Sequence, residues 1–271
     1  MPLITQMSAD DYRRIFAAVE AKLIEVASQT LTVDRVRKTL NESKKLEGRT
    51  FSDDECYSKL VVVTFYSGFR AETVTDRMPA IRKHFPDYET VAAYGESDIQ
   101  AILRDKSILR HEQKIRSSVG NATVVQEMVG TYGSFHAYID SFAPHSSFRN
   151  LLLLREDLQS RFKYLGDVTS FHFMTDLGLR VLKPDRVICR IFKRLGLIRS
   201  TDLILKTVVE GRAFACATGY PIRYIDKVFV AYGQESSEGL GIQKGICVKN
   251  SPDCAICGVQ DYCDYYRERS A

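Results

Sequence analysis

The 271-residue sequence predicts an all-α fold, for three reasons. Apolar residues recur at helical spacing through most of the chain. The first of these runs begin at residues that cap helices or at acidic residues that favour a helix N-terminus. The β-branched run 61–64 is the one segment that also suits a strand, and no partner strand of similar quality lies near it. We therefore expect helices throughout.

The first helix is predicted over residues 8–29, where Ser8 precedes apolar side chains at helical spacing. Residues 33–46 are charged and suit either a short helix or a surface connection. The next helix begins at the acids 53–55 and is apolar nearly all round up to Tyr66, so we expect it to be buried. The following helix, 71–84, stops before Pro86. A turn is predicted at 130–134, and the other helices over 90–94, 96–103, 110–122, 135–142, 155–164, 168–177 and 186–195.

Composition restricts where the protein works. A hydrophobic content of 45% is sufficient for a good core, and no run of about 18 apolar residues suggests a membrane span. Residues 1–11 lack the basic and apolar regions of a secretory signal, so we expect a cytoplasmic protein. The net charge of +4 does not by itself imply nucleic acid. Basic residues do gather between 180 and 199, where Asp185 is the single acid: Arg180, Lys183, Arg186, Arg190, Lys193, Arg194 and Arg199.

Four of the seven cysteines fall within seventeen residues near the C-terminus: Cys247, Cys254, Cys257 and Cys263. One Cys-x-x-Cys pair flanked by wider gaps can place four thiolates around an iron–sulfur cube. A zinc site more usually has two tight pairs, because one ion needs four sulfurs at about 2.3 Å. We therefore favour a [4Fe-4S] cluster, with zinc as one alternative. Two disulfides are another, although nothing else about the chain is typical of a secreted protein.

This cysteine spacing resembles the cluster loop of the endonuclease III and adenine-glycosylase families, DNA repair enzymes of the helix-hairpin-helix superfamily. A second resemblance lies in the middle of the chain. Residues 98–122 and 161–179 are similar to the 3-methyladenine DNA glycosylase I family, which belongs to the same superfamily. The two resemblances cover about residues 58–182 and 247–263 and indicate one fold.

The resemblances imply a two-lobed helix-hairpin-helix DNA glycosylase fold with a C-terminal [4Fe-4S] cluster loop. Residues 50–180 would form a six-helix, barrel-like lobe that includes the hairpin. Residues 1–49 and 181–271 would form a second helical lobe with the catalytic aspartate and the cluster loop, and the active cleft would lie between the lobes. The implied partner is double-stranded DNA containing a damaged base. We expect a monomer that contacts no membrane and is nucleoid-associated if bacterial.

The hairpin is expected at Tyr164–Thr169, between two predicted helices. A helix-hairpin-helix presents backbone N–H groups at a helix N-terminus to one phosphate. Gly166 would let the backbone approach DNA, Thr169 would add a hydroxyl donor, and Lys163 belongs to the same DNA-binding set. An ordinary αα turn with a glycine is the alternative.

Further DNA contacts are expected outside the hairpin. Phe69 and Arg70, between two helices, would fill the gap left by an extruded base, although a solvent-facing loop or a core phenylalanine fits equally well. Arg186 and the basic residues after it are expected to contact phosphates, with a solvated helix face as the alternative. Cys56, Cys189 and Cys216 lie outside the cluster loop and are expected to be buried and structural.

Asp185 is the candidate catalytic residue, since the superfamily carries an aspartate at the start of the helix after the hairpin unit. A fixed anion there stabilises the oxocarbenium-like sugar and orients or deprotonates water. Asp185 also suits a plain helix N-cap, worth about 1 kcal/mol, and the two roles are compatible. The lysine nucleophile of endonuclease III-type lyases is replaced by Val168, so a Schiff-base reaction is not expected. A lyase would need another lysine, such as Lys163 or Lys183.

The sequence thus predicts a monofunctional DNA glycosylase in base excision repair. The base-recognising glutamate and the tryptophan of the 3-methyladenine family align with Val63 and Ala71, so that family's specificity does not transfer. Alkylated purines are the first substrate class expected, because a cationic base leaves without a general acid. A non-catalytic iron–sulfur protein that binds damaged DNA, and a bifunctional glycosylase and abasic-site lyase, are the alternatives.

Overall fold

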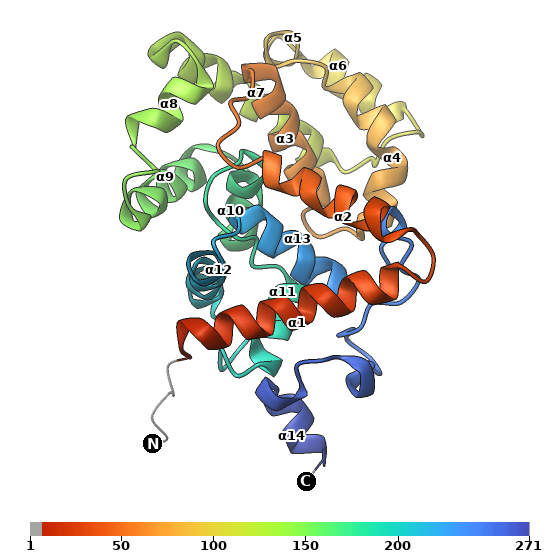
Figure 1. The fold of residues 1–271 in the computed structure, drawn as a ribbon. Helices are drawn as coiled ribbons and strands as arrows, with labels where there is room; N and C mark the ends of the chain where they lie inside the picture. The colour runs from red at the N-terminus through yellow and green to blue at the C-terminus, as the bar shows by residue number, and fades with distance from the viewer. Residues whose placement is uncertain (1–6, 271) are drawn as a thin grey trace. The chain divides into compact units, whose positions relative to one another are not determined.

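The computed structural model describes residues 7–270, which form helices joined by turns (Figure 1). Within that range no strand forms, and one isolated antiparallel bridge joins Ser237 to Ile242. The all-α prediction is therefore confirmed for the described residues. Searched over the same residues, no helix has the length and apolarity to cross a membrane. The expectation of no secretory signal rests partly on residues 1–6, which lie outside the described range.

The chain divides into two compact units. Residues 49–179 form a continuous unit, here called the central unit. Of the described residues, 7–48 and 180–270 form the second, here called the discontinuous unit because the central unit interrupts it in sequence.

The central unit is built on α7, which packs against α3, α5, α6 and α8. Its core includes the clustered rings of Phe135, Phe162 and Phe173 and the fully buried Tyr57. The helices of this unit are α3 (Asp53–Tyr66), α4 (Ala71–His84), α5 (Tyr88–Ala92), α6 (Glu96–Arg104), α7 (Glu112–Tyr132), α8 (Phe135–Ser141), α9 (Phe148–Arg161) and α10 (Asp167–Asp176).

The discontinuous unit packs α1 across α12 and α13, with Phe16, Phe192, Phe214 and Phe229 in contact at its centre. Its elements are α1 (Ala9–Ala27), α2 (Val33–Glu42), η1 (Ser43–Lys45), α11 (Arg186–Arg194), α12 (Ile204–Thr218), α13 (Ile222–Gly233), η2 (Glu238–Leu240), η3 (Cys254–Ile256), η4 (Gln260–Tyr262) and α14 (Asp264–Ser270). Both α12 and α13 lie in a stretch for which no element was predicted.

Most predicted helices are present, with shifts at their ends. The run 61–64 is helical within α3, which excludes the strand alternative, and residues 33–46 form α2 and η1. Among the helices that were predicted, 110–122 differs most from the structure, because α7 continues to Tyr132 and ends at Gly133, whose φ is +86°. The turn expected at 130–134 therefore begins about three residues later. Gly120 and Gly130 are tolerated inside α7 because packing on its neighbours outweighs their low helix propensity.

Candidate functional site

The predicted hairpin lies in the central unit between α9 and α10. Tyr164 adopts a left-handed backbone conformation with φ +65°, and Gly166 is the N-cap of α10. The hydroxyl Oγ1 of Thr169 accepts from the Gly166 N–H at 2.7 Å and donates to the Tyr164 carbonyl at 2.7 Å. The single hydrogen of this hydroxyl is thus used inside the turn. Thr169 shapes the hairpin here rather than offering the free donor we expected.

The first turn of α10 leaves backbone donors open. The amides of Asp167, Val168 and Thr169 have no hydrogen-bond acceptor among the residues that the structure describes. Gly166 is exposed and carries no side chain over them, and the neighbouring Lys163 is also exposed. A helix N-terminus with open N–H groups attracts anions. This end of α10 therefore has the chemistry to bind one phosphate.

Asn121 on α7 holds the hairpin from beneath, a role that the sequence did not suggest. Its side chain is 1% exposed, donates to the carbonyl of Lys163 at 3.1 Å and accepts from the N–H of Lys163 at 2.9 Å. Both backbone groups of Lys163 are therefore satisfied, while its side chain remains in solvent. The signal in the sequence is the spacing of Lys114, Ser118 and Asn121, three polar residues on one face of α7.

The segment Ser67–Arg70 joins α3 to α4 and is here called the tip. Gly68 at its centre has φ +78°, Phe69 is 37% exposed and Arg70 is exposed. The solvent-facing alternative to a core phenylalanine is thus the one observed. Beneath the tip, Lys114 of α7 donates through Nζ to the carbonyls of Thr64 and Ser67. Lys114 is a second buried residue that the sequence did not suggest.

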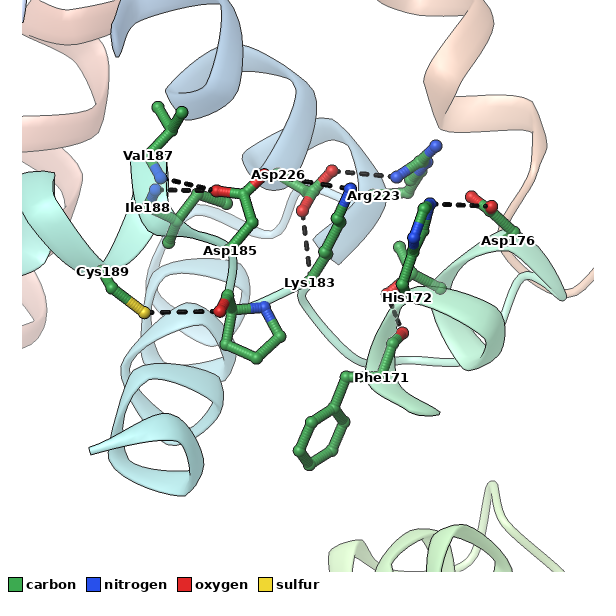
Figure 2. A network of polar contacts seen from close by, with 12 residues as sticks. Phe171, His172, Asp176, Lys183, Asp185, Val187, Ile188, Cys189, Arg223 and Asp226 are labelled. Carbon is green, nitrogen blue, oxygen red and sulfur yellow. Dashed lines mark hydrogen bonds and ion pairs between the residues drawn. The ribbon is translucent and has the colours of Figure 1, made fainter. Parts of the chain in front are cut away.

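Asp185 lies in the discontinuous unit at the N-terminus of α11 (Figure 2). Its Oδ1 accepts from the N–H groups of Val187 and Ile188 at 2.9 and 3.0 Å, so the N-cap role is confirmed. Its other oxygen, Oδ2, lies 4.0 Å from the Nζ of Lys183. The side chain is 22% exposed and therefore remains accessible to water. The carboxylate is held in one orientation with one oxygen free of backbone bonds.

The segment before Asp185 is anchored by a buried carboxylate from α13. Asp226, 3% exposed, accepts from the N–H of Lys183 at 3.1 Å and from Arg223 at 2.9 Å (Figure 2). Burial raises the pKa of Asp226, and the charge of Asp185 adds to this rise, while Arg223 opposes it. Asp226 thus braces the Lys183–Asp185 turn from beneath. Nothing in the sequence pattern distinguished it from an ordinary surface acid.

The four C-terminal cysteines surround one small cavity, together with Val19, Ile191, Tyr232 and Tyr266. Cys257 and Cys263 are buried, and Cys247 and Cys254 are partly buried. Burial raises the pKa of the Cys247 and Cys263 thiols, and a hydrogen bond from Arg194 to Cys247 Sγ at 3.2 Å opposes it for Cys247. Among the described residues, no three His, Cys, Asp or Glu side chains are close enough to hold a single metal ion. All seven cysteines are free thiols, so the disulfide alternative is not observed.

Two residues of the predicted phosphate-binding run turn inward instead. Arg190 donates to the carbonyls of Gly233 and Cys247, and Arg194 donates to those of Cys247, Val248 and Lys249. Their guanidinium groups hold residues 247–263, here called the cysteine loop, and are not free for DNA. Arg186 and Lys193 are exposed and retain the predicted chemistry.

The three cysteines outside the cysteine loop differ in burial. Cys56 and Cys189 are buried, as expected for structural cysteines. Cys216 is exposed, which corrects the prediction for that residue. It lies in the last turn of α12, on a side of the helix that no other element of the described chain covers closely enough to bury it.

Comparisons with known proteins identify both the family and the fold. The methyladenine glycosylase family model matches residues 47–186, just over half of the chain. DNA-3-methyladenine glycosylase 1 of Escherichia coli (strain K12) is 29% identical over an alignment of 111 residues that covers 35% of this chain and 59% of that protein. The match thus spans less than two thirds of this relative's length.

Two solved structures align with a larger part of the chain. A trapped covalent intermediate of endonuclease III with DNA covers 89% of this chain and all of its own, with a TM-score of 0.57 and 16% identity. The 8-oxoguanine DNA glycosylase of Thermotoga maritima covers 80% of this chain and 96% of its own, with a TM-score of 0.51 and 17% identity. At these identities the likeness concerns the fold, which is that of the helix-hairpin-helix glycosylases. The family model matches more than half of the chain, and the hairpin and Asp185 both lie inside the matched residues 47–186. The chain therefore belongs to the methyladenine glycosylase family.

Proposed function

We propose that this protein is a monofunctional DNA glycosylase of base excision repair, which hydrolyses the N-glycosidic bond of a damaged base flipped out of duplex DNA. The observation that carries the proposal is the fixed carboxylate of Asp185. It follows a hairpin with open backbone donors in sequence, and both lie within the segment matched by the family model. Family membership supports the reaction class, and the geometry of Asp185 supports its role.

Asp185 has two tasks in the proposed reaction. Departure of the base builds positive charge on the sugar, and an anion held in place before the reaction stabilises that charge. The bonds from Val187 and Ile188 to Oδ1 fix the group, which leaves Oδ2 to face the sugar or to accept a proton from the attacking water. The Nζ of Lys183 lies 4.0 Å from Oδ2, so a basic side chain stands beside the oxygen that the backbone leaves free.

Alkylated purines are the proposed substrate class. A purine that carries a positive charge is already a good leaving group, so no general acid is required. The E. coli relative is named for 3-methyladenine, which is such a base. The pocket is nevertheless expected to differ, because Val63 is buried and apolar where that family has its glutamate, and Ala71 begins α4 where it has its tryptophan.

A lyase reaction has one geometric argument in its favour. The Nζ of Lys183 lies 4.0 Å from Asp185 Oδ2, so an amine is present beside the proposed catalytic carboxylate. The hairpin position used by lyases holds Val168, and Lys163 is exposed outside the turn. Borohydride trapping on abasic DNA tests this alternative: a covalent adduct that disappears in Lys183→Met would establish it, and no adduct supports hydrolysis alone.

We propose that Cys247, Cys254, Cys257 and Cys263 hold a [4Fe-4S] cluster. Four thiols line one cavity, and one Cys-x-x-Cys pair flanked by wider gaps suits the cube better than zinc, which more usually has two tight pairs. Arg194 and Arg190 bring positive charge and hydrogen bonds to the loop, as thiolates around a cluster require. The group would be structural or redox-sensing, and the loop residues would fix the end of α11.

The cluster is tested by iron and sulfide analysis of purified protein with its visible absorption spectrum. Four irons and four sulfides per chain are expected, falling below a tenth of that in Cys257→Ser. Cys216→Ser is the matched control, since that exposed cysteine lies outside the loop and should leave the iron content unchanged. One zinc per chain and no iron would contradict the proposal.

The glycosylase reaction is tested with duplex oligonucleotides carrying methylated, deaminated or oxidised bases, followed by hot alkali to reveal abasic sites. Release of a base by the wild type and its loss in Asp185→Asn would establish the reaction and its lesion class. If neither protein releases any base while both bind DNA, the chain is a DNA-binding protein without catalysis.

A further inference from the structure

Lys114 is a buried cation for which the proposed reaction has no use. It is 2% exposed, on α7 in the middle of the central unit. Burying an ammonium is costly unless it is fully hydrogen-bonded, and burial lowers the pKa of Lys114 to about 8. An exposed lysine can bond the carbonyls at a helix C-terminus without this desolvation cost, so the burial of Lys114 needs a specific reason.

The ammonium of Lys114 joins two segments that are far apart in sequence. It donates to the carbonyls of Thr64 and Ser67, which end α3 and begin the tip. It also lies 5.3 Å from the ring centre of Phe69 in the tip and 4.3 Å from that of Tyr164 in the hairpin. One charge therefore contacts the tip through backbone and ring, and the hairpin through a ring.

Tyr164 supplies independent evidence that the hairpin needs this support. A non-glycine residue at φ +65° costs free energy, so neighbouring contacts must maintain it. Its carbonyl is bonded to Thr169, its neighbour Lys163 is held by Asn121, and its ring lies over the Lys114 ammonium. Of the three contacts just described, the one with Lys114 also links the hairpin to the tip.

We propose that Lys114 is a positioning residue that holds the tip and the hairpin in one fixed arrangement for DNA. The inference rests on the proposed DNA-binding function. The hairpin would grip a phosphate while Phe69 occupies the space of an extruded base, and both need a set separation along the duplex. Loss of the ammonium would release each segment separately. Recognition of a flipped site would suffer more than general affinity for DNA.

The test compares binding to a duplex with a tetrahydrofuran abasic analogue and to the same duplex undamaged. Fluorescence anisotropy gives both dissociation constants for the wild type, Lys114→Met and Lys59→Met. Lys59 is the matched control, because its ammonium also covers a ring of the central unit, Phe51, at 4.1 Å. We expect Lys114→Met to lower the preference for the abasic duplex at least tenfold, and Lys59→Met to keep it within twofold.

A second pair of variants removes the same contact from the hairpin side, in case Lys114→Met does not fold. Tyr164→Leu loses the ring and should reproduce the tenfold loss, whereas Tyr164→Phe keeps the ring and should keep the preference. An unchanged preference in Lys114→Met or in Tyr164→Leu, with wild-type protein that binds normally, overturns the inference alone. Wild-type protein that binds neither duplex overturns the proposed function and the inference together.

Discussion

The helices α10 and α11 begin in opposite ways. The N-terminus of α10 starts at Gly166, which is exposed and leaves the next amides without an acceptor among the described residues. The N-terminus of α11 starts at Asp185, whose carboxylate accepts from the amides of Val187 and Ile188 in the first turn of α11. Both ends carry the same partial positive charge.

The difference shows how one local element serves two chemistries. An open helix N-terminus attracts an anion from outside, as a hairpin for phosphate requires. A helix N-terminus filled by its own side chain fixes that anion for use on another molecule. The groups behind them are also opposite, because the buried Lys114 supports the hairpin and the buried Asp226 supports the turn before α11. Four variants test this comparison.

The largest effect is expected from Asp185→Asn. Asparagine is as good an N-cap as aspartate, so the helix should keep its cap while the site loses its charge. The single-turnover rate of base release should fall by about 10²-fold or more. Thermal unfolding measured in parallel should shift by less than about 2 °C. A large fall in both quantities would show that the residue acts only as a cap.

The next largest effect is expected in the pH dependence of the free energy of unfolding, through the titration of Lys114. The pKa of this lysine is about 8 in the folded chain and 10.5 as its ordinary value. Between these pH values the unfolded chain binds the additional proton, so the free energy of unfolding should rise with pH, by about 3 kcal/mol in total. Urea unfolding from pH 7.5 to 10.5 measures the rise in the wild type and its absence in Lys114→Met. Other titrating groups are common to both proteins and cancel in the difference.

A smaller effect is expected when the open N-terminus of α10 is covered. A Cβ on Gly166 would lie 3.8 Å from Thr169 Oγ1, so Gly166→Ala fits without a clash and places a methyl group over the phosphate site. Affinity for duplex DNA should fall about fivefold, or about 1 kcal/mol. Gly95→Ala is the matched control, because Gly95 is a glycine N-cap of the same unit with the same bond to the third residue of its helix. Equal losses of DNA affinity in the two variants would show that the N-terminus of α10 has no special role in binding.

The smallest effect tests the charge beside the open end. Asp167 is the first residue of α10, and its exposed carboxylate, paired with Arg155, repels an incoming phosphate. Asp167→Asn should therefore tighten DNA binding by about twofold at low salt, with the gain lost at high salt. Glu96→Gln, at the same position of α6, should have no effect. Weaker binding in Asp167→Asn would mean that its pairing with Arg155 matters more than its charge.

Much of the fold followed from local rules in the sequence. Ser8 caps α1 and Asp185 caps α11 as predicted, because a cap depends on residues two or three positions away. The four cysteines were singled out by their spacing within one segment, and Asp185 by the resemblance to the superfamily, which has an aspartate at the start of this helix; their proposed roles stay predictions. The length of α7 was missed because Gly120 and Gly130 are local breakers that long-range packing overrides.

What sequence reasoning missed depends on partners distant in the chain. Arg190 and Arg194 had the pattern of phosphate contacts, but their acceptors lie more than forty residues later, at the end of α13 and in the cysteine loop. Lys114 and Asn121 resemble surface residues until the hairpin, about fifty and forty residues away, is placed over them. The sign of a side chain's charge can be read from the sequence. The group that the charge contacts is known only from the fold.

One further consequence follows from the position of Arg190 and Arg194 on α11. This nine-residue helix is about 13 Å long, with Asp185 at one end and, towards the other, two arginines that grip the cysteine loop. If the proposed cluster is present, a chain assembled without it would leave those arginines bonded to an unsupported loop and the end of α11 without an anchor. The carboxylate of Asp185, the proposed catalytic group, would then lie on a less rigid helix. The proposed release of damaged bases would in this way depend on iron being available when the proposed cluster is assembled.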